Sequence, residues 1–255
     1  MKIGIMTAMD QEYEMASRVL KGNSRHDIIP VHCGWGKVNS AVNAYRLIAE
    51  HNPDCIISTG CAGGIAADVH LLDVVVAAQV AYHDCWYGEP NEYGQVQGFP
   101  ARFDADPTLL AAAKRLVAGK PSAPGRWAGR STPKTGSISG TPDFDPQGAN
   151  HPGIARPKAN AAGKLHFGLM ASGDRFVSGK ADTAAVLAHF PDALACDMES
   201  GSISQVCKMF VVPFLSIRVI SDTANEDDRL GQFENFWDTV GSESFEILRS
   251  FINEL

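Results

Sequence analysis

The chain has 255 residues, which is enough for one large domain or two small ones. Hydrophobic residues make up 45% of the sequence and charged residues 20%, a composition typical of a globular protein with a full apolar core. The formal net charge of −7 argues against a general nucleic-acid binder, because a protein that binds the phosphate backbone needs a basic face.

No apolar run reaches membrane-spanning length, and the N-terminal residues become acidic too early for a secretory signal. The six cysteines are scattered without a C-x-x-C pair, which favours buried thiols over a disulfide framework or a zinc site. We therefore expect a cytoplasmic protein with no cofactor, no metal and no membrane partner.

Strand-like and helix-like segments alternate along the chain. Short apolar runs predict strands at residues 2–8, 27–33, 54–58, 73–83, 164–172, 192–196 and within 209–221. Apolar residues at helical spacing predict helices at residues 10–20, 37–51, 106–118, 180–190 and 233–255. Asp10 is a candidate N-cap of the first helix, and Pro30 indicates an edge strand. This alternation is typical of an α/β protein with a mostly parallel central sheet.

One segment interrupts the alternation. Residues 119–163 contain half of the 14 prolines and a third of the 24 glycines, without hydrophobic periodicity. Such a composition does not suit a core element, and the segment is too long for a simple connection. We expect a single domain over residues 1–255, with an insertion at about 119–163 that forms a surface loop held by the body of the protein or by a second subunit.

Polar, acidic or glycine-rich segments follow several of the predicted strands. In open α/β sheets, ligands bind beyond the carboxyl ends of the strands. The segments at those ends are AMDQE (8–12), TGCAGG (59–64), GDRFVSG (173–179), DMES (197–200) and SDTANEDD (221–228). Acids and glycines that converge on one sheet edge are difficult to explain as solvated turns alone, so we expect a ligand site at this edge.

Each segment also has a purely structural interpretation. Asp197 and Glu199 lie in an otherwise apolar stretch, and a D-x-E pair is compatible with a solvated turn between a strand and a helix. The segment 59–64 matches neither a dinucleotide fingerprint nor a P-loop. It forms either a tight turn or a surface where the backbone approaches a flat ligand. Arg218 and Asp222 can point to one face of the last strand, either as a buried structural ion pair or as part of a site.

Two aromatic side chains near these segments are also open to two interpretations. His83 is more typical of a core histidine with satisfied hydrogen bonds than of a catalyst. Phe176 is either a core residue or a stacking surface for a ligand.

Taken together, the motifs make the chain similar to the purine nucleoside phosphorylase superfamily, and most of all to the 5′-methylthioadenosine/S-adenosylhomocysteine nucleosidases. The combination is far more specific than any single motif, and it extends over most of the chain outside the insertion. The motifs are MKIGIMTAMDQE, GWGKVNSA, STGCAGGIA, YHD, EYGQVQGFPARFDAD, SGDRFVSG, DMESGSISQVC and VPFLSIRVISD. The resemblance implies a three-layer α/β fold with a mixed, bent central sheet flanked by helices, and a place in purine nucleoside metabolism and methionine salvage.

The resemblance assigns the DMES segment to the ribose pocket. Glu199 would accept hydrogen bonds from the sugar hydroxyls, and Met198 would pack under the sugar as an adaptable apolar surface. A carboxylate held there would favour the oxocarbenium-like transition state of N-glycoside cleavage. Asp197 would be structural.

The resemblance also implies which groups move protons. Asp222 would donate a proton to the purine N7, with Ser221 orienting its carboxyl group. Glu12 would act as general base on the attacking water, and Arg218 would help to place that water. The acid and the base would then lie on opposite sides of the scissile bond.

The remaining binding residues come from three segments. Cys61, Ala62 and Gly63 would line the site from the glycine segment, whereas Phe176 and Val177 would hold the base. The chain departs from the family at Cys61, where a serine or similar small polar residue is usual. It also has a shortened hairpin after the first helix, besides the insertion.

Two large aromatic residues, Trp35 and Phe103, would surround the 5′ end of the ligand. By resemblance, they would do so partly from the neighbouring subunit, which predicts a homodimer with sites near the interface. Ordinary core packing is the other interpretation of both rings.

The predicted activity is hydrolysis of the N-glycosidic bond of methylthioadenosine, adenosylhomocysteine or a related purine nucleoside, with release of adenine. One alternative is another superfamily member: a nucleoside phosphorylase, an AMP nucleosidase or a futalosine hydrolase. The other is a nucleoside-binding or storage protein without turnover. The presence of Glu12, Glu199 and Asp222 favours an enzyme over a storage protein.

Overall fold

The structure is a computed structural model that describes residues 1–118, 163–224, 229–239 and 245–255. The insertion expected at about 119–163 lies outside these residues, except for Gly163. Within the described part, no helix combines the length and the apolar character that a membrane crossing requires.

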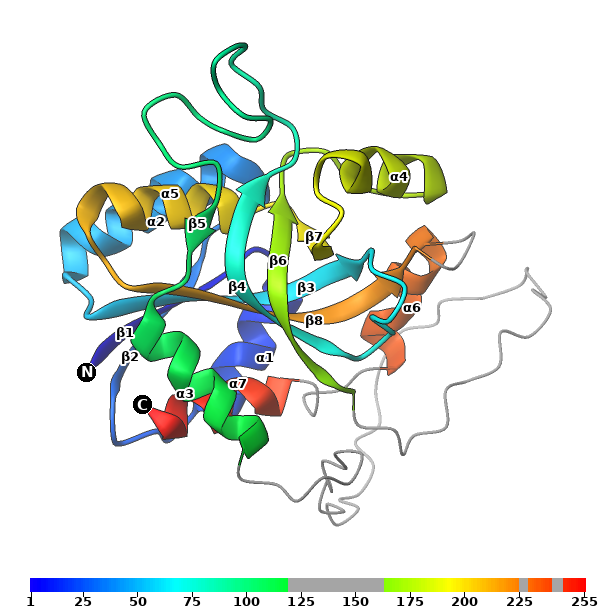
Figure 1. Cartoon of the computed structure of the whole chain (residues 1–255). Coiled ribbons are helices and arrows are strands. Elements are labelled where there is room, and N and C mark those ends of the chain that lie inside the picture. Colours follow the sequence, from blue (N-terminus) through cyan, green and yellow to red (C-terminus); the bar gives the residue numbers. More distant parts are fainter. Residues whose placement is uncertain (119–162, 225–228, 240–244) are drawn as a thin grey trace, which may run out of the picture.

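The described residues form eight strands and seven helices (Figure 1). The strands are β1 Lys2–Thr7, β2 Asp27–His32, β3 Cys55–Gly64, β4 Val74–Tyr82, β5 Phe103–Asp104, β6 Leu165–Ser172, β7 Ala193–Asp197 and β8 Phe214–Thr223. The helices are α1 Asp10–Leu20, α2 Gly36–His51, α3 Pro107–Ala118, α4 Lys180–His189, α5 Ser200–Phe210, α6 Arg229–Thr239 and α7 Glu246–Glu254.

All eight strands belong to one mixed sheet, which closes partly on itself. The order is β2-β1-β3-β7-β6-β4-β5, and β8 pairs with both β3 and β4. Because β8 pairs with both β3 and β4, the strands β3, β7, β6, β4 and β8 form a ring. β8 is parallel to β3 and antiparallel to β4. This closure produces the bend that the resemblance implies.

The ring brings the carboxyl ends of separate strands together. β3 and β7 pair antiparallel through two residue pairs, Gly63–Cys196 and Gly64–Ala195, at the carboxyl ends of both strands. β8 ends beside them, because Thr223 pairs with Gly64. The segments TGCAGG, DMES and SDT therefore meet at one edge of the sheet.

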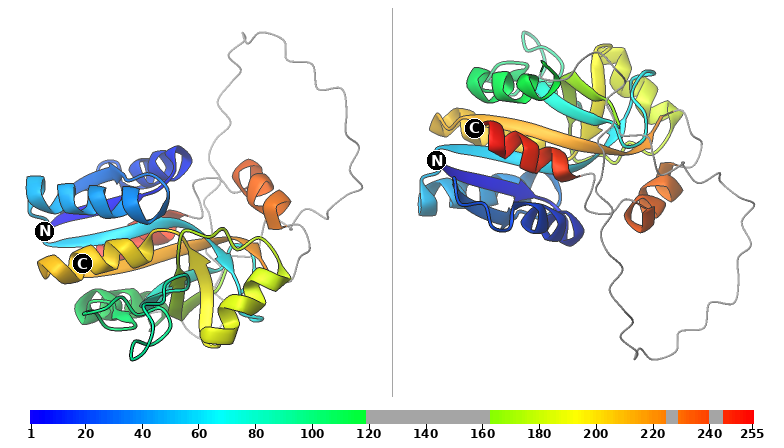
Figure 2. Two further views of the ribbon diagram at one scale, coloured as in Figure 1. Left: turned by 90° about the horizontal axis from the view of Figure 1, so that it is seen from above. Right: turned by 90° about the horizontal axis from the view of Figure 1, so that it is seen from below.

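Helices cover both faces of the sheet (Figure 2). Ile5 of β1 and Ile57 of β3 pack in a buried cluster with α1, α3, α6 and α7. Their sequence neighbours Met6 and Ile56 pack in a second cluster with α2 and α5. Alternate residues of a strand face opposite layers. Because both layers are apolar, the strands have continuous apolar sequences instead of alternating ones.

Pro30 lies in β2, and β2 is an edge strand as expected. The prediction that Asp10 caps the first helix is wrong, because Met9 occupies the N-cap position with φ −118° and ψ 154°. The Glu12 carboxylate at the third helical position accepts the Met9 N–H instead, which leaves the Asp10 side chain exposed.

Two predicted segment boundaries are also wrong. Residues 59–64 are the second half of β3, because they pair with β8 instead of turning. The single helix expected over 233–255 is described as two helices, with the link 240–244 outside the described residues. Its two halves have different neighbours: α6 contacts β8, whereas α7 packs against α1 and α3.

Phe251 of α7 is fully buried in the cluster beneath the sheet. We expect Phe251→Ala to lower the free energy of unfolding by about 3–5 kcal/mol, the cost of removing a buried phenyl ring and leaving a cavity. Urea denaturation measures this change. The control is Val117→Ala on α3, where the side chain is half exposed and the change should stay within about 0.5 kcal/mol. Equal effects of the two substitutions would contradict this packing.

Candidate active site

A cavity of about 290 Å³ opens where the strand ends meet. Its walls come from the β1–α1 junction, the end of β3, the segment after β6, the β7–α5 junction, the end of β8 and α6. Except for Arg218 and Phe103, every predicted site residue lines it: Glu12, Trp35, Cys61, Ala62, Gly63, Phe176, Val177, Met198, Glu199, Ser221 and Asp222. A cavity thus lies beyond the carboxyl ends of the strands, where the ligand site was predicted.

Glu12 is buried and its carboxylate is held by backbone donors. The N–H groups of Ala8 and Met9 donate to Oε2 at 2.9 and 3.1 Å, and that of Cys61 donates to Oε1 at 2.7 Å. Gly60 has a φ of +146°, and a side chain there would collide with this carboxylate. Burial raises the pKa of Glu12 above its usual value, whereas the nearby Arg218 guanidinium opposes that rise.

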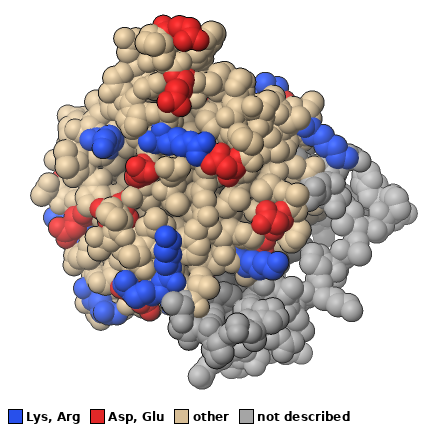
Figure 3. Space-filling view, viewed as in Figure 1, with Lys and Arg blue, Asp and Glu red and all other residues tan. Residues whose placement is uncertain are grey.

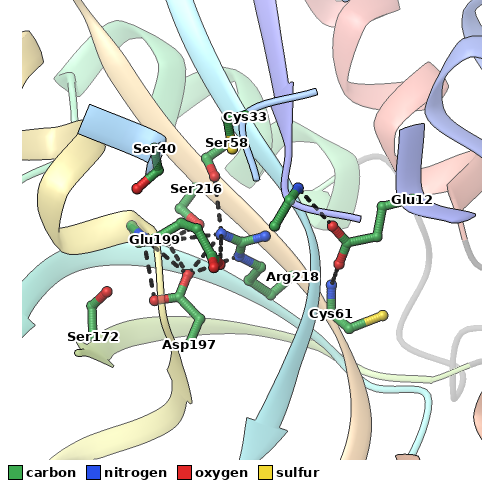
Figure 4. A network of polar contacts seen from close by, with 12 residues as sticks. Glu12, Cys33, Ser40, Ser58, Cys61, Ser172, Asp197, Glu199, Ser216 and Arg218 are labelled. Atoms are coloured by element: carbon green, nitrogen blue, oxygen red, sulfur yellow. Dashed lines mark hydrogen bonds and ion pairs between the residues drawn. The ribbon is translucent and has the colours of Figure 1, made fainter. Parts of the chain in front are cut away.

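Arg218 lies behind the cavity wall and pairs with Asp197 (Figure 4). Its Nε and Nη2 donate to Asp197 Oδ2 at 2.9 and 2.8 Å, and Nη2 also donates to Ser58 Oγ at 3.0 Å. Both charged side chains are about 1% exposed. An arginine can occupy the apolar strand β8 because these partners satisfy its guanidinium. The prediction that Asp197 is structural fits this geometry.

Glu199 occupies the N-cap position of α5 and reaches into the cavity. Its Oε1 accepts the N–H of Gly36 at 2.9 Å, and its Oε2 lies 3.7 Å from Arg218 Nη2. Burial raises the pKa of Glu199 to about 7, and the charge of Asp197 adds to the rise, while Arg218 and the Gly36 N–H lower it. The D-x-E segment is therefore buried and paired, and is not a solvated turn.

A β-bulge places both Ser221 and Asp222 on the cavity. In the ladder between β3 and β8, Ala62 pairs with Ile220 but Gly63 pairs with Asp222, so Ser221 is the extra residue. Ser221 Oγ lies 2.8 Å from Asp222 Oδ1. The bulge interrupts the simple alternation from which Arg218 and Asp222 were expected to share a face, and the described partners of Arg218 are Asp197, Glu199 and the serines beside them.

One wall of the cavity is apolar and aromatic. Phe176 lines it while 42% exposed, and its ring contacts Phe233 of α6 edge-on, with 6.3 Å between ring centroids. Val177 beside it is buried. Trp35 lines the cavity from the residue before α2 and is 57% exposed.

The structure does not bring Phe103 to the cavity of its own chain. The ring is buried in β5 and contacts Tyr82 and Phe99. Core packing is thus its role within one chain, and its expected contact across a subunit interface stays a prediction.

Sequence reasoning missed several cavity residues, above all Met9, Arg175, Cys196 and Phe233. Met9 and Arg175 lie within the selected segments AMDQE and GDRFVSG, and Cys196 directly precedes DMES, so these segments were the available signal. Phe233 belongs to the segment predicted as an amphipathic helix, where its spacing is indistinguishable from that of a core residue.

Burial shifts the pKa values of Cys61 and His83 in the directions that favour their uncharged forms. Burial raises the pKa of the Cys61 thiol well above its usual value, so the group stays protonated at the cavity wall. Burial lowers the pKa of His83, which is outside the cavity lining. His83 Nε2 has no hydrogen-bond partner among the described residues, so His83 is a core histidine, although not a fully satisfied one.

Comparison with known proteins assigns this chain to a family. The family model described as the phosphorylase superfamily matches residues 2–253. A 5′-methylthioadenosine/S-adenosylhomocysteine nucleosidase of Geobacillus sp. (strain WCH70) is 32% identical over 234 residues, which cover 90% of this chain and 82% of the relative.

Solved structures give the same result. The corresponding nucleosidase from S. pneumoniae, with the transition-state inhibitor MT-ImmA, is 27% identical with a TM-score of 0.75 and covers 99% of this chain and 98% of that one. The enzyme from Neisseria meningitidis, in complex with methylthio-immucillin-A, is 26% identical with a TM-score of 0.76, over 100% and 99% of the two chains. The chain belongs to the phosphorylase superfamily and, within it, to the 5′-methylthioadenosine/S-adenosylhomocysteine nucleosidases.

Proposed function

We propose that the cavity binds 5′-methylthioadenosine or S-adenosylhomocysteine and hydrolyses its N-glycosidic bond, releasing adenine. The observation that carries the proposal is the convergence of Glu12, Glu199 and Asp222, from three distant parts of the sequence, on one cavity. The nucleosidases similar to this chain support the same activity. A binding protein without turnover would not need three buried carboxyl groups in one cavity, so that alternative is not favoured.

Glu199 binds the sugar in this proposal. Its Oε1 is held by the Gly36 N–H, and the carboxyl group faces the cavity beside Met198. Hydrogen bonds from ribose hydroxyls to Glu199 increase electron density at the ring and so stabilise the positive charge that develops as the glycosidic bond breaks. Met198 contributes an apolar surface that adapts to the sugar.

Asp222 and Glu12 move the protons. Asp222, oriented by Ser221, gives its proton to N7 of adenine as the bond between C1′ and the base breaks, so that the electron pair leaves on a neutral base. Glu12 takes a proton from the water whose oxygen attacks C1′. A pKa raised by burial suits Glu12 to accept a proton near neutral pH. The charge of Arg218 acts on Glu12, because it opposes the rise in the pKa of that carboxyl group.

Residues of the aromatic wall hold the base. Phe176 offers a partly exposed ring, and Val177 follows it with its backbone at the cavity. Adenine is flat and apolar on both faces, so a ring and the peptide planes of Ala62 and Gly63 suit it. A small ligand also agrees with the surface in Figure 3, where acidic and basic side chains are interspersed on the visible described face.

We also propose a homodimer with its sites near the interface. The outer face of α2 carries the exposed side chains of Val38, Val42 and Tyr45, which follow Trp35 in the sequence. The end of α5 adds the exposed apolar residues 209–211. The rings of Tyr45 and Phe210 lie 5.5 Å apart, so the two helices form one apolar surface. Such a surface suits a second copy of the chain.

We further propose a cytoplasmic location. All six cysteines have free thiols, which suits the reducing environment of the cytoplasm.

Asp222→Asn should nearly abolish adenine release and leave nucleoside binding largely intact. Asparagine keeps the shape of the side chain but cannot supply the proton, and general acid catalysis contributes about 10²–10⁴-fold to the rate. Turnover of methylthioadenosine and calorimetric binding measure the two effects. The matched control is Asp104→Asn, an exposed residue of β5, which should keep normal turnover. A variant with nearly wild-type kcat would remove Asp222 from its assigned role.

The reaction should need no phosphate and should yield the free sugar. A phosphate at the position of the attacking water would lie beside the Glu12 carboxylate, and two like charges about 4 Å apart repel by roughly 4 kcal/mol at an effective dielectric near 20. Arg218 would offset little of this, because it is already paired with Asp197. The measurement is adenine release in phosphate-free buffer, with product analysis. Strict dependence on phosphate and formation of a sugar 1-phosphate would instead indicate a phosphorylase.

Val42→Glu should shift the protein toward monomers, because it places a charge in the centre of the apolar surface on α2. Light scattering at micromolar concentration measures the mass of the wild type and of the variant. Val117→Glu is the control, because Val117 is similarly exposed on α3, away from that surface. A wild type that is monomeric and fully active would refute the shared-site proposal.

A further inference from the structure

We propose that Lys37, Asp84 and Asp174 are positioning residues for the sugar-binding carboxylate, and that they act through the N–H of Gly36. This inference rests on the proposed function, since it concerns how Glu199 is aimed at the sugar hydroxyls. None of the three residues lines the cavity. Each lies beside a segment that does, or beside the group that holds Glu199.

The contact to be maintained is the hydrogen bond between Gly36 and Glu199. The Gly36 N–H is the first of α2 and donates to Glu199 Oε1 at 2.9 Å, in a buried position. Gly36 has a φ of +80°, and a Cβ there would lie 2.8 Å from Asp174 Oδ1. The start of α2 is thus pressed against Asp174, and glycine is required at this point.

A closed set of contacts holds that point in place. The Lys37 backbone N–H donates to Asp174 Oδ1 at 2.7 Å, and its Nζ donates to both oxygens of Asp84 at 2.9 Å. The Asp174 N–H in turn donates to Asp84 Oδ2 at 2.8 Å. Lys37 Nζ also lies 3.9 Å from Asp174 Oδ2. Three segments far apart in the sequence are therefore joined by one ammonium group.

The pair between Lys37 and Asp84 is partly sheltered from water, whereas the Asp174 side chain is 49% exposed. The side chains of Lys37 and Asp84 are 26% and 18% exposed, and Lys37 Nζ lies 5.4 Å from the centre of the Tyr82 ring. Partial burial strengthens the attraction of Lys37 for two carboxylates that otherwise repel each other. Asp84 and Asp174 each lie two residues after a strand, β4 and β6 respectively, and Lys37 is the second residue of α2.

Removal of the ammonium group leaves Asp84 and Asp174 facing each other without a cation between them. The start of α2 then separates from Asp174, and Gly36 withdraws its N–H from Glu199. Arg218 Nη2, 3.7 Å from Glu199 Oε2, remains as the nearby cation and draws the carboxylate toward itself and away from the sugar. The loss therefore falls on the contact with the ribose hydroxyls.

The test compares Lys37→Met with wild type on two substrates, methylthioadenosine and its 2′,3′-dideoxy analogue, which lacks the hydroxyls that Glu199 contacts. We expect kcat/KM on methylthioadenosine to fall roughly tenfold, as when a hydrogen bond to a charged group is lost. On the dideoxy analogue it should stay within about twofold, because the analogue makes no use of that bond. Asp84→Asn should show the same selective loss.

Lys2→Met is the matched control. Lys2 lies at the opposite end of β1 and donates to the His51 carbonyl oxygen, so both substrates should be cleaved as by wild type. Thermal unfolding of each variant checks the fold. An equal loss on both substrates, or no loss on either, would overturn the positioning role. If the wild type released no adenine, the proposed function would fail, and calorimetric binding of the two nucleosides to wild type and Lys37→Met would still test the inference.

Discussion

The site depends on the buried ion pair between Arg218 and Asp197. Both side chains are about 1% exposed, and an isolated charge in such a place would cost several kcal/mol. Each charged side chain can be buried only because the other is paired with it. Because the guanidinium also lies 3.7 Å from Glu199, one cation serves both carboxylates of the β7–α5 junction. This explains how DMES can lie within an otherwise apolar stretch. Asp197 pairs with the buried Arg218, and Glu199 lies close enough to be attracted by the same guanidinium.

One guanidinium cannot neutralise every carboxylate around the cavity, and the structure uses other means for the rest. Glu12 is held by three backbone N–H groups from the β1–α1 junction and from β3. Glu199 has the N–H of Gly36. Burial nevertheless raises the pKa of both side chains, which brings proton binding closer to neutral pH than it would be in water. A site built to move protons at that pH gains from this balance.

The incorrect expectations share a cause, which is that local patterns do not reveal partners distant in sequence. Residues 59–64 were predicted to follow the strand, either as a tight turn or as a surface for a flat ligand, yet β8 lies alongside and extends them as a strand. Arg218 and Asp222 were matched to each other by spacing along a regular strand, but the bulge at Ser221 changes the register, and Asp197 provides the partner. The Phe103 ring packs against Tyr82 within its own chain, and its expected contact across a subunit interface stays a prediction.

The sequence by itself determined the alternating elements and the apolar character of strands such as β4, because these follow from hydrophobic periodicity. It also determined the edge position of β2 and the residue types that converge on one sheet edge, because these follow from the chemistry of each side chain. Resemblance added the family and most of the cavity residues. Only the tertiary structure decided which oxygen of Glu199 meets Gly36, that Arg218 pairs with Asp197, and that Phe233 of α6 closes one wall. These contacts join residues up to 163 positions apart, and the ring closure of the sheet, which no local pattern encodes, brings them together.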